Sequence, residues 1–321
     1  MSAILSAIEI YLPEQVETNA DLERQFPLWR MKQIGEKTGI QQRHRADSGQ
    51  CASDLAAAAA ERLFASGACR REQVDFVLFC TQTPDYFLPT TACLLQSRLQ
   101  LSPGIGALDF NLGCSGFIYG LSLAAGLVHS GQARNILLLT ADTYTKLVDG
   151  PDRNVKTLFG DAAAATLVQH HEEGTGCAIG PFVFGTDGSG AENLIVRGGA
   201  FRHPTEPPIL KMNGPEIFQF SLRVVPPCLE ELAQRASLRL DEIDLFVPHQ
   251  ANRYMLEHLR DKMEIPAEKF FIGMENCGNT VSSSIPIALH QLRQQGKVLE
   301  GNRIALVGFG VGYSWGGCLL R

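Results

Sequence analysis

The sequence predicts an α/β fold made of two similar halves, and two observations carry this prediction. Short β-branched and aromatic stretches alternate with longer apolar stretches of helical period. Segment 71–79, polar and then strand-like, is echoed at 240–247, with Asp75 and Asp244 separated by 169 positions. Strand-like segments 134–139 and 302–307 are separated by 168 positions. Two matches at nearly one offset indicate a duplicated domain.

Each half is expected to run strand, loop, helix, strand, glycine-containing loop, helix, strand. In chain order, helices are predicted over 53–66, with Ser53 as N-cap, and then over 115–130, 216–236, 251–263 and 282–295. Such alternation predicts parallel strands with right-handed crossovers, buried between helical layers. The halves, 1–172 and 173–321, are expected to meet at a polar turn near 170–176. Its paired histidines lack a nearby third ligand, so no metal site is predicted.

Composition excludes several classes of protein. The 321 residues include 28 Lys and Arg against 34 Asp and Glu, a net charge of -6, with no basic run, so nucleic acid is not an expected partner. Residues 110–133 include no charged side chain, but their polar residues and five glycines favour a loop and a buried helix over a membrane span. Nine irregularly spaced cysteines predict free thiols in a reducing cytoplasm. The first residues, with Glu9 and no basic start, do not resemble a signal peptide.

Cys114 is the candidate nucleophile. It lies among small residues between a strand end and a long apolar helix. The positive end of the helix and its N–H groups would stabilise a thiolate there. A buried structural cysteine is the alternative. The flanking glycines, which allow a substrate to approach closely, favour the nucleophile.

The repeat relates two further polar residues to Cys114. Adding 165 to 168 positions to Cys114 leads to Asn279 to Ser282, just before the matching helix of the second half, while His249 ends the strand that matches the one ending at Cys80. Ligands collect at the carboxyl ends of strands in open α/β sheets, so the three side chains are expected at one crevice. Both Asn279 and Asn252 are also suited to be helix N-caps. The placement opposite Cys114 favours a catalytic Asn279, which gives one nucleophile and two neutral hydrogen-bond donors.

These residues resemble the ketoacyl synthase III family of thiolase-fold condensing enzymes, from Leu12-Pro13 to the carboxyl end. The matching motifs are Thr38-Gly-Ile40, Cys114 in Cys-Ser-Gly-Phe, Phe159-Gly-Asp161, His249-Gln-Ala-Asn252, Gly278-Asn-Thr280 with Ser284 and Pro286, and the run from Gly308 to Gly316. Three catalytic motifs in the family's order make the resemblance specific. It implies a duplicated, thiolase-like αβαβα layered fold.

The resemblance also implies a decarboxylative condensation through an acyl-Cys114 intermediate. Cys114 would take an acyl group from coenzyme A or a carrier protein, and a malonyl thioester, expected on acyl carrier protein, would then lose carbon dioxide. His249 and Asn279 would donate hydrogen bonds to the enolate oxygen. The implied oxyanion-hole loop is Gly310, Val311 and Gly312, acting with the N–H of Cys114. No cofactor is expected, because coenzyme A and phosphopantetheine thioesters are the substrates.

Binding roles follow from the same resemblance. Leu88 and Phe159 would line the acyl pocket, with core packing as the alternative for Phe159. Segment 84–89 resembles the one that reaches a partner subunit, so a homodimer is expected. The implied donor and carrier contacts are Lys37, Arg153, Asn252 and Arg253. A basic patch of Arg253, Arg260 and Lys262 would attract the acidic carrier protein.

The chain departs from the family pattern around the donor. Where members that use acetyl coenzyme A have Trp and Arg before Thr-Gly-Ile, this chain has Gln33 and Lys37, with Trp29 displaced. Tyr254 and Pro215 stand at two further divergent positions. These changes predict weaker or altered recognition of coenzyme A. Housekeeping and specialised starter synthases both remain as alternatives.

Three other functions are alternatives to condensation. Papain-like thiol hydrolases also have Cys, His and Asn in this order, but the surroundings of Cys114 and the duplicated fold disfavour that class. An acyltransferase that forms an ester or amide without decarboxylation is disfavoured by Asn279, because only enolate formation needs a second donor. An inactive homologue serving as a partner subunit would be expected to lack one of the three residues.

Overall fold

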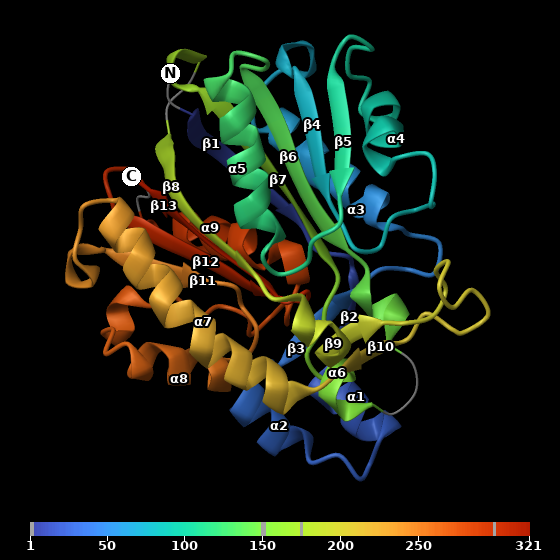
Figure 1. The fold of residues 1–321 in the computed structure, drawn as a ribbon. Coiled ribbons are helices and arrows are strands. Elements are labelled where there is room, and N and C mark those ends of the chain that lie inside the picture. Colours follow the sequence, from blue (N-terminus) through green and yellow to red (C-terminus); the bar gives the residue numbers. More distant parts are fainter. Residues whose placement is uncertain (1–2, 149–151, 174–175, 298–299) are drawn as a thin grey trace.

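The computed structural model describes residues 3–148, 152–173, 176–297 and 300–321. Within these residues one large mixed sheet forms the centre of the molecule (Figure 1). Its nine strands, in spatial order, are β11 (Leu245–Pro248), β12 (Ile304–Gly310), β13 (Ser314–Leu320), β8 (Cys177–Thr186), β1 (Ala3–Tyr11), β7 (Ala162–His170), β6 (Asn135–Asp142), β4 (Phe76–Cys80) and β5 (Gly106–Phe110). Two small sheets pair β2 (Gln15–Thr18) with β3 (Gln42–Arg45), and β9 (Leu194–Val196) with β10 (Leu210–Met212).

The expectation of parallel strands is only partly right. Among the described residues, β4 pairs in parallel with β5 and β6, and β11 with β12. The central strands β1, β7, β8 and β13 pair antiparallel. The reason is clearest at β12 and β13, which are separated by residues 311–313 alone. So short a connection can form only an antiparallel hairpin, whereas a parallel pair needs a long crossover.

The two halves form two groups of strands within this sheet. Strands β5, β4, β6, β7 and β1 belong to the first half, and β8, β13, β12 and β11 to the second. The groups are joined where Ile4 and Leu5 of β1 pair with Ala178 and Cys177 of β8. The predicted boundary after residue 172 lies in the short helix η3 (His171–Glu173), between β7 and β8.

Corresponding contacts confirm the internal repeat. Asp75 accepts a hydrogen bond from the N–H of Asn135, and Asp244 accepts one from the N–H of Arg303. Both aspartates precede a strand that follows a short helix, η1 (Arg71–Gln73) or η5 (Leu240–Glu242). One predicted element is missing from the second half. The counterpart of β5 is reduced to an isolated bridge between Phe246 and Phe270.

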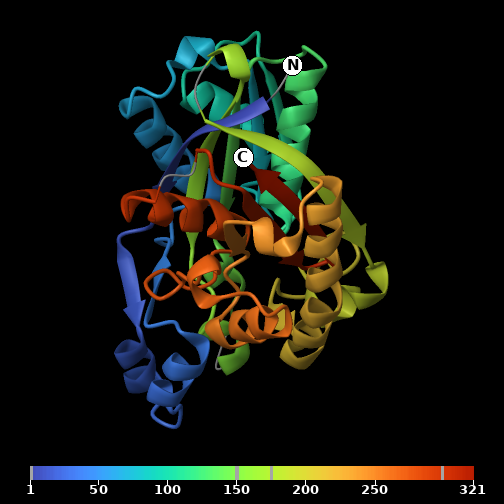
Figure 2. The ribbon, with the colours of Figure 1, turned by 90° about the vertical axis from the view of Figure 1, so that its left-hand side faces the viewer.

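Helices cover both groups of strands and separate them (Figure 1, Figure 2). Helices α5 and α9 contact strands of both halves and form the central layer. Helices α3 and α4 pack on the first half, and α7 packs on the second with α8 beside it. The α-helices are α1 (Asn19–Gln25), α2 (Met31–Thr38), α3 (Ala52–Ala65), α4 (Thr91–Arg98), α5 (Gly116–His129), α6 (Arg153–Lys156), α7 (Gly214–Arg235), α8 (Arg253–Lys262) and α9 (Ser284–Gln294). This arrangement is the predicted αβαβα layering.

The five predicted helices are present, and their ends differ by one to two residues. One predicted cap is wrong. Cys51, not Ser53, is the N-cap of α3, and its N–H is accepted by Asp54. The Ser53 hydroxyl instead donates to Asp85 at 2.6 Å, a contact between distant residues that local sequence does not reveal. No helix in the described part of the chain is both long and apolar enough to cross a membrane.

Candidate active site

A cavity of about 730 Å³ is lined by Cys114, His249 and Asn279. Cys114 precedes α5, His249 follows β11, and Asn279 lies just before the short helix η7 (Val281–Ser283) and α9. The structure therefore brings together the three side chains that the repeat predicted to share one crevice. One comes from the first half and two come from the second.

The end of β12 packs directly against Cys114. A Cβ atom added to Gly310 would lie 2.9 Å from Cys114 Cβ and 3.0 Å from its Sγ. One added to Gly308 would lie 2.7 Å from the carbonyl oxygen of Cys114. These distances are shorter than side-chain contacts allow, so both positions require glycine. The two glycines therefore let the backbone of β12 approach the Cys114 thiol.

Burial disfavours the ionised form of Cys114. Cys114 is 6% exposed, and its burial raises the pKa of the thiol to about 12, with the nearby charge of Asp142 as the second cause. Burial therefore opposes the thiolate that the position before α5 was expected to stabilise. The neutral thiol is the form of Cys114 that this environment favours.

A raised thiol pKa predicts the pH dependence of alkylation at Cys114. The thiolate is the reactive form. At pH values below the pKa, the fraction of thiolate should increase about tenfold for each unit by which the pH is raised. The rate constant for iodoacetamide at Cys114 should therefore rise close to tenfold per unit from about pH 6 to about pH 9. Peptide mass spectrometry would follow the label at this residue, with the exposed Cys93 as an internal reference. A plateau near neutral pH would contradict the prediction, because it would mean a thiolate stabilised by the helix.

His249 is buried and neutral. It is 2% exposed, and burial lowers the pKa of its imidazole to about 3. The ring is held from one side by Ser284, whose Oγ lies 2.6 Å from Nδ1. Phe309 packs edge-on against the ring with centroids 5.6 Å apart. The neutral histidine that the resemblance implied is thus favoured by the environment over most of the pH range.

Asn279 is fixed through its backbone and its side chain. Its N–H donates to Leu158 O at 2.8 Å, and its carbonyl accepts from Gly160 N at 3.0 Å. Its Oδ1 accepts from Val281 N at 3.0 Å, which leaves Nδ2 directed at His249 Nε2, 3.5 Å away. Asn279 is not a helix N-cap, since Thr280 has that position for η7 and Ser283 for α9. The side-chain nitrogen of Asn279 remains a donor that faces the cavity.

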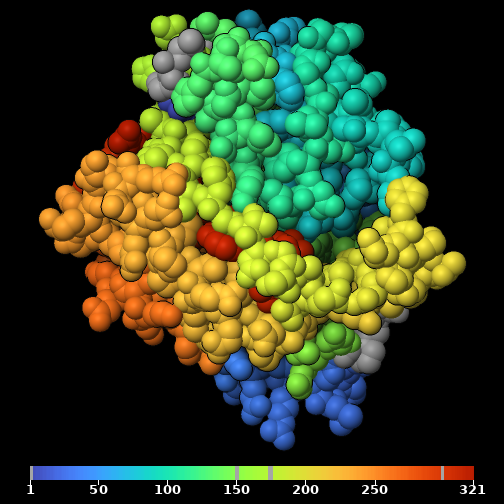
Figure 3. Space-filling model, viewed as in Figure 1, coloured from blue at the N-terminus to red at the C-terminus, as the bar shows by residue number. Residues whose placement is uncertain are grey.

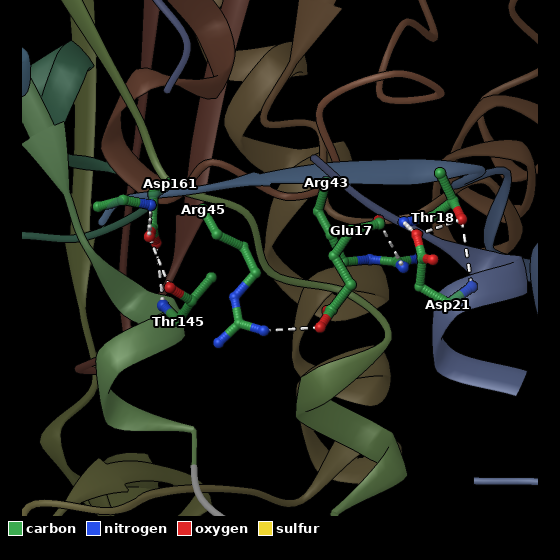
Figure 4. Close-up of polar contacts among 8 residues, drawn as sticks. Glu17, Thr18, Asp21, Arg43, Arg45, Thr145 and Asp161 are labelled. Carbon is green, nitrogen blue, oxygen red and sulfur yellow. Dashed lines mark hydrogen bonds and ion pairs between the residues drawn. The ribbon is translucent and has the colours of Figure 1, made fainter. Parts of the chain in front are cut away.

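Asp161, the last residue of the Phe159-Gly-Asp motif, is hydrogen-bonded to Thr145 (Figure 4). Its carboxylate accepts hydrogen bonds from Thr145 N at 2.9 Å, Thr145 Oγ1 at 2.6 Å and Ala46 N at 2.8 Å. Gly160, between the two named residues, has no room for a Cβ, which would lie 2.3 Å from Cys277 O. The motif anchors the backbone segment that pairs with Asn279.

Asp142, to which the sequence analysis gave no role, links the two halves at the site. It ends β6, where its Oδ1 accepts from Gln82 N at 2.8 Å and its Oδ2 accepts from the N–H and hydroxyl of Ser282. Two residues earlier, Thr140 Oγ1 lies 2.9 Å from Ser283 Oγ. Burial raises the pKa of Asp142 to about 7. The signal in the sequence was an acid that ends an apolar strand, which is costly unless it is hydrogen-bonded.

The predicted oxyanion-hole loop is divided between two cavities. Gly310 lines the catalytic cavity, whereas Val311 and Gly312 line a second one of about 1050 Å³. Two hydroxyls connect this loop to Ser115, the residue after Cys114. Ser115 Oγ lies 2.7 Å from Ser314 Oγ, which donates to Val311 O at 2.9 Å. The loop thus lies between the thiol and the second cavity.

The two predicted acyl-pocket residues lie in different places. Phe159 is 3% exposed, lines the catalytic cavity and contacts the ring of Tyr144 with centroids 5.1 Å apart. Leu88 is 82% exposed and lines the second cavity. Of these two residues, therefore, only Phe159 lines the same cavity as Cys114 within one chain.

Three of the four predicted donor contacts line the catalytic cavity: Lys37, Arg153 and Asn252. Asn252 is also the N-cap of α8, since its Oδ1 accepts from Met255 N at 2.9 Å. The Lys37 ammonium lies 4.6 Å from the centre of the Tyr254 ring. Tyr254 and Lys37 thus give this wall of the cavity an aromatic ring and a positive charge, where members that use acetyl coenzyme A have Trp and Arg before Thr-Gly-Ile.

Arg253 is the exception among these contacts. It lines two other hollows, not the catalytic cavity. Its side chain packs across Gly39, where an added Cβ would lie 2.7 Å from Arg253 Cβ and where φ is +74°. Gly39, the glycine of Thr38-Gly-Ile40, is therefore required for two reasons: it ends α2 with a positive φ, and it leaves room for the Arg253 side chain.

Comparison with known proteins agrees with these observations. Family profiles match residues 108–188, as 3-oxoacyl-[acyl-carrier-protein (ACP)] synthase III, and residues 233–321, as the C-terminal part of that enzyme. The beta-ketoacyl-[acyl-carrier-protein] synthase III of Caldanaerobacter subterraneus subsp. tengcongensis is 35% identical, with 97% of this chain and 95% of that protein covered.

Solved structures give the same result. A crystal structure of a 3-oxoacyl-(acyl-carrier-protein) synthase III is 51% identical, with a TM-score of 0.97 over 100% of this chain and 99% of its own. The priming beta-ketosynthase of the R1128 polyketide pathway is 28% identical, with a TM-score of 0.91 over 99% of this chain and 96% of its own. The layered fold inferred from the resemblance is confirmed. From the full-length similarity and the residues gathered at the cavity, we conclude that the chain belongs to the 3-oxoacyl-[acyl-carrier-protein] synthase III family.

Proposed function

We propose that the chain condenses an acyl thioester starter with a malonyl thioester, through an acyl-Cys114 intermediate and with loss of carbon dioxide. The observation that carries the proposal is the cavity in which one thiol accompanies two neutral N–H donors, His249 and Asn279. A thiol can hold an acyl group between two half-reactions. Paired N–H donors suit an oxygen that gains negative charge. In this proposal the side chains and thioester substrates do the chemistry without a cofactor.

In the loading half-reaction, Cys114 Sγ attacks the carbonyl carbon of the starter thioester. The Cys114 proton leaves as the new C–S bond forms, and the donor thiol departs with a proton when the tetrahedral intermediate collapses. The oxyanion of that intermediate would be held by backbone N–H groups of Cys114 and of the Gly310 to Gly312 loop. The glycine at 310 supports this role, because a Cβ atom added there would lie 3.0 Å from the sulfur, so a larger residue would push the loop away.

In the condensing half-reaction, the bond between the malonyl α-carbon and its carboxylate breaks and its electrons form an enolate. Negative charge gathers on the thioester oxygen, which would accept hydrogen bonds from His249 Nε2–H and Asn279 Nδ2–H. The enolate carbon then attacks the acyl carbonyl, and the Cys114 sulfur leaves and regains a proton. A cationic histidine would bind the substrate carboxylate as strongly as the enolate, so a neutral donor serves this step better.

One product assay separates this function from acyl transfer without decarboxylation. Purified protein, an acyl donor and malonyl carrier protein should give a β-ketoacyl thioester and one carbon dioxide for each product. An ester or amide formed without carbon dioxide would support the alternative. Absence of any product from all donors, in protein whose Cys114 becomes acylated, would contradict condensation.

We further propose that the donor is recognised by its negative charges. Arg30, Lys37 and Arg153 line the catalytic cavity, and no carboxylate is among its described lining residues. Coenzyme A and phosphopantetheine both carry phosphate, so either carrier fits this charge. Gln33 and Tyr254 also line the cavity and give the nucleotide of coenzyme A a surface unlike that of acetyl-coenzyme-A users.

Reversing the charge at Lys37 should test this recognition. The Lys37→Glu variant should raise KM about tenfold for acyl coenzyme A at low ionic strength, and less at about 0.15 M salt, because the exposed charge is screened. Its rate with an uncharged N-acetylcysteamine thioester should stay unchanged. Lys32→Glu is the matched control, since Lys32 is exposed on the same helix and is not among the cavity residues. Equal KM effects in both variants would contradict a local role for Lys37.

Helix α8 is the proposed docking site for the acidic carrier protein, with a smaller basic patch than expected. Two of its three predicted cations already have partners. Arg260 donates to Asp261 at 2.7 and 2.9 Å, and Lys262 Nζ donates to Leu222 O at 2.9 Å. Arg253, for which the described residues offer no ion pair, is the cation proposed to contact the carrier protein.

A homodimer is also part of the proposal. Phe87, Leu88 and Phe201 are 70%, 82% and 89% exposed, and the two phenylalanine rings lie 5.5 Å apart. In Figure 3 the yellow segment near residue 200 stands out from the surface beside a hollow. Exposed apolar groups of this size commonly mark an interface. A solution mass near twice the 35.0 kDa of one chain would support the dimer, and a monomeric mass would contradict it.

A further inference from the structure

Ser284 is in direct contact with the imidazole of His249. Its Oγ lies 2.6 Å from His249 Nδ1, and the two residues are 2% exposed. Ser284 begins α9, whereas His249 follows β11, so the contact joins two separate elements of the second half. No step of the proposed reaction uses the serine itself.

The hydroxyl proton of Ser284 has one suitable acceptor. The other hydrogen-bond contact of its Oγ within the described residues is the N–H of Gln250 at 3.4 Å, which is a donor. A hydroxyl can accept that hydrogen bond and donate its own proton elsewhere. Nδ1 of the neutral imidazole is the acceptor within reach. Donation from Ser284 to Nδ1 leaves the single ring proton on Nε2.

The opposite tautomer would disable the site. With the proton on Nδ1, the lone pair of Nε2 would face Asn279 Nδ2, 3.5 Å away, and would accept its hydrogen bond. The Asn279 amide could then offer less to a substrate, and the buried Ser284 proton would lack an acceptor. Because Asn279 Oδ1 is already bonded to Val281 N, the amide does not rotate to relieve this conflict without losing that bond.

With the proton on Nε2, the two nitrogens are both donors. They do not bond to each other, and both are free to donate to a third atom in the cavity. Two N–H groups 3.5 Å apart can converge on one oxygen. The proton on Nε2 therefore converts His249 and Asn279 into a single binding site for an oxygen acceptor.

We propose that Ser284 is a positioning residue that fixes His249 as its Nε2–H tautomer and so pairs it with Asn279 as a donor to the malonyl thioester oxygen. This inference deepens the proposed condensation and rests on it for the identity of that oxygen. Ser284 acts through His249 and does not touch the reacting atoms.

The test combines a tautomer measurement with a kinetic split. Nitrogen-15 NMR of labelled imidazoles reports which ring nitrogen carries the proton, and the His249→Asn spectrum identifies the signal among the eight histidines. Wild-type protein should show Nε2–H, Ser284→Ala a mixture of tautomers, and Ser284→Thr the wild-type form. Condensation by preloaded acyl-Cys114 should fall about tenfold in Ser284→Ala, the effect of one buried hydrogen bond, and recover in Ser284→Thr. Acyl loading should be unchanged in both.

Ser283→Ala is the matched control. Ser283 is a buried neighbour whose Oγ donates to Thr140 O at 3.1 Å and has no contact with His249 among the described residues. It should leave the tautomer of His249 unaltered. A wild-type Nδ1–H signal, or an unaltered tautomer and condensation rate in Ser284→Ala, would overturn the proposal. The NMR measurement needs no substrate, so failure of wild-type protein to condense would contradict the proposed function separately.

Discussion

Replacing Cys114 with alanine should abolish the acyl-enzyme and lower condensation at least ~1000-fold, because the covalent route is lost. Wild-type protein mixed with a donor thioester should gain the mass of one acyl group. The Cys114→Ala protein should gain none. Intact-mass spectrometry measures both directly, and the remaining condensation is measured from β-ketoacyl product.

The nine cysteines make a thiol control necessary. Cys93 is exposed on α4 and is free of disulfide bonds. The Cys93→Ser protein should acquire the acyl mass and condense at the wild-type rate. Peptide mapping that found the acyl group on any other cysteine would show that Cys114 is not the nucleophile.

Removing the donor nitrogen of Asn279 should separate the two half-reactions. Asn279→Ala should lower condensation about 100-fold or more, the usual effect of losing one donor to a developing charge, while leaving acylation of Cys114 measurable. Asn279→Asp tests the same nitrogen more sharply, because it keeps an oxygen to accept from Val281 N. Its negative charge beside the enolate should lower condensation further.

Asn135→Ala controls for loss of a buried amide hydrogen bond. Asn135 is 7% exposed on β6, and its Oδ1 accepts from Gln169 Nε2 at 2.6 Å. This variant should lose thermal stability but keep both half-reactions. Single-turnover assays with preloaded enzyme give the condensation rate apart from loading. Equal losses of loading and condensation in Asn279→Ala would indicate a collapsed site and contradict a donor role.

Local sequence patterns and the internal repeat were sufficient to predict much of the fold and of the candidate site. Helix periodicity located the five long helices, and the spacing of Asp75 and Asp244 located the matching strands. A similar offset, 165 positions, placed Asn279 with Cys114 without any knowledge of distances. These features depend on residues near one another in the chain or on a whole repeated unit.

The features that sequence reasoning missed depend on packing between distant segments. Burial raises the pKa of the Cys114 thiol, and this burial comes from surrounding elements that no local window includes. The antiparallel pairing of β12 with β13 follows from a hairpin so short that helix and strand periodicity does not reveal it. Ser284 stood in a matching motif, but its contact with His249 spans 35 positions.

The pairing between the backbone at Phe159 and that at Asn279 has an evolutionary consequence. One wall of the proposed acyl pocket is held by the same bridge that orients the Asn279 amide, since Asn279 N donates to Leu158 O and Asn279 O accepts from Gly160 N. A substitution that reshapes this wall for a longer acyl chain also displaces the Asn279 amide. At this wall, therefore, a change in acyl-chain preference is coupled to a change in turnover. Leu194 in β9 lines the same cavity and has no such bridge to Asn279 in the described chain. Chain-length preference is therefore freer to diverge between lineages at Leu194 than at Phe159.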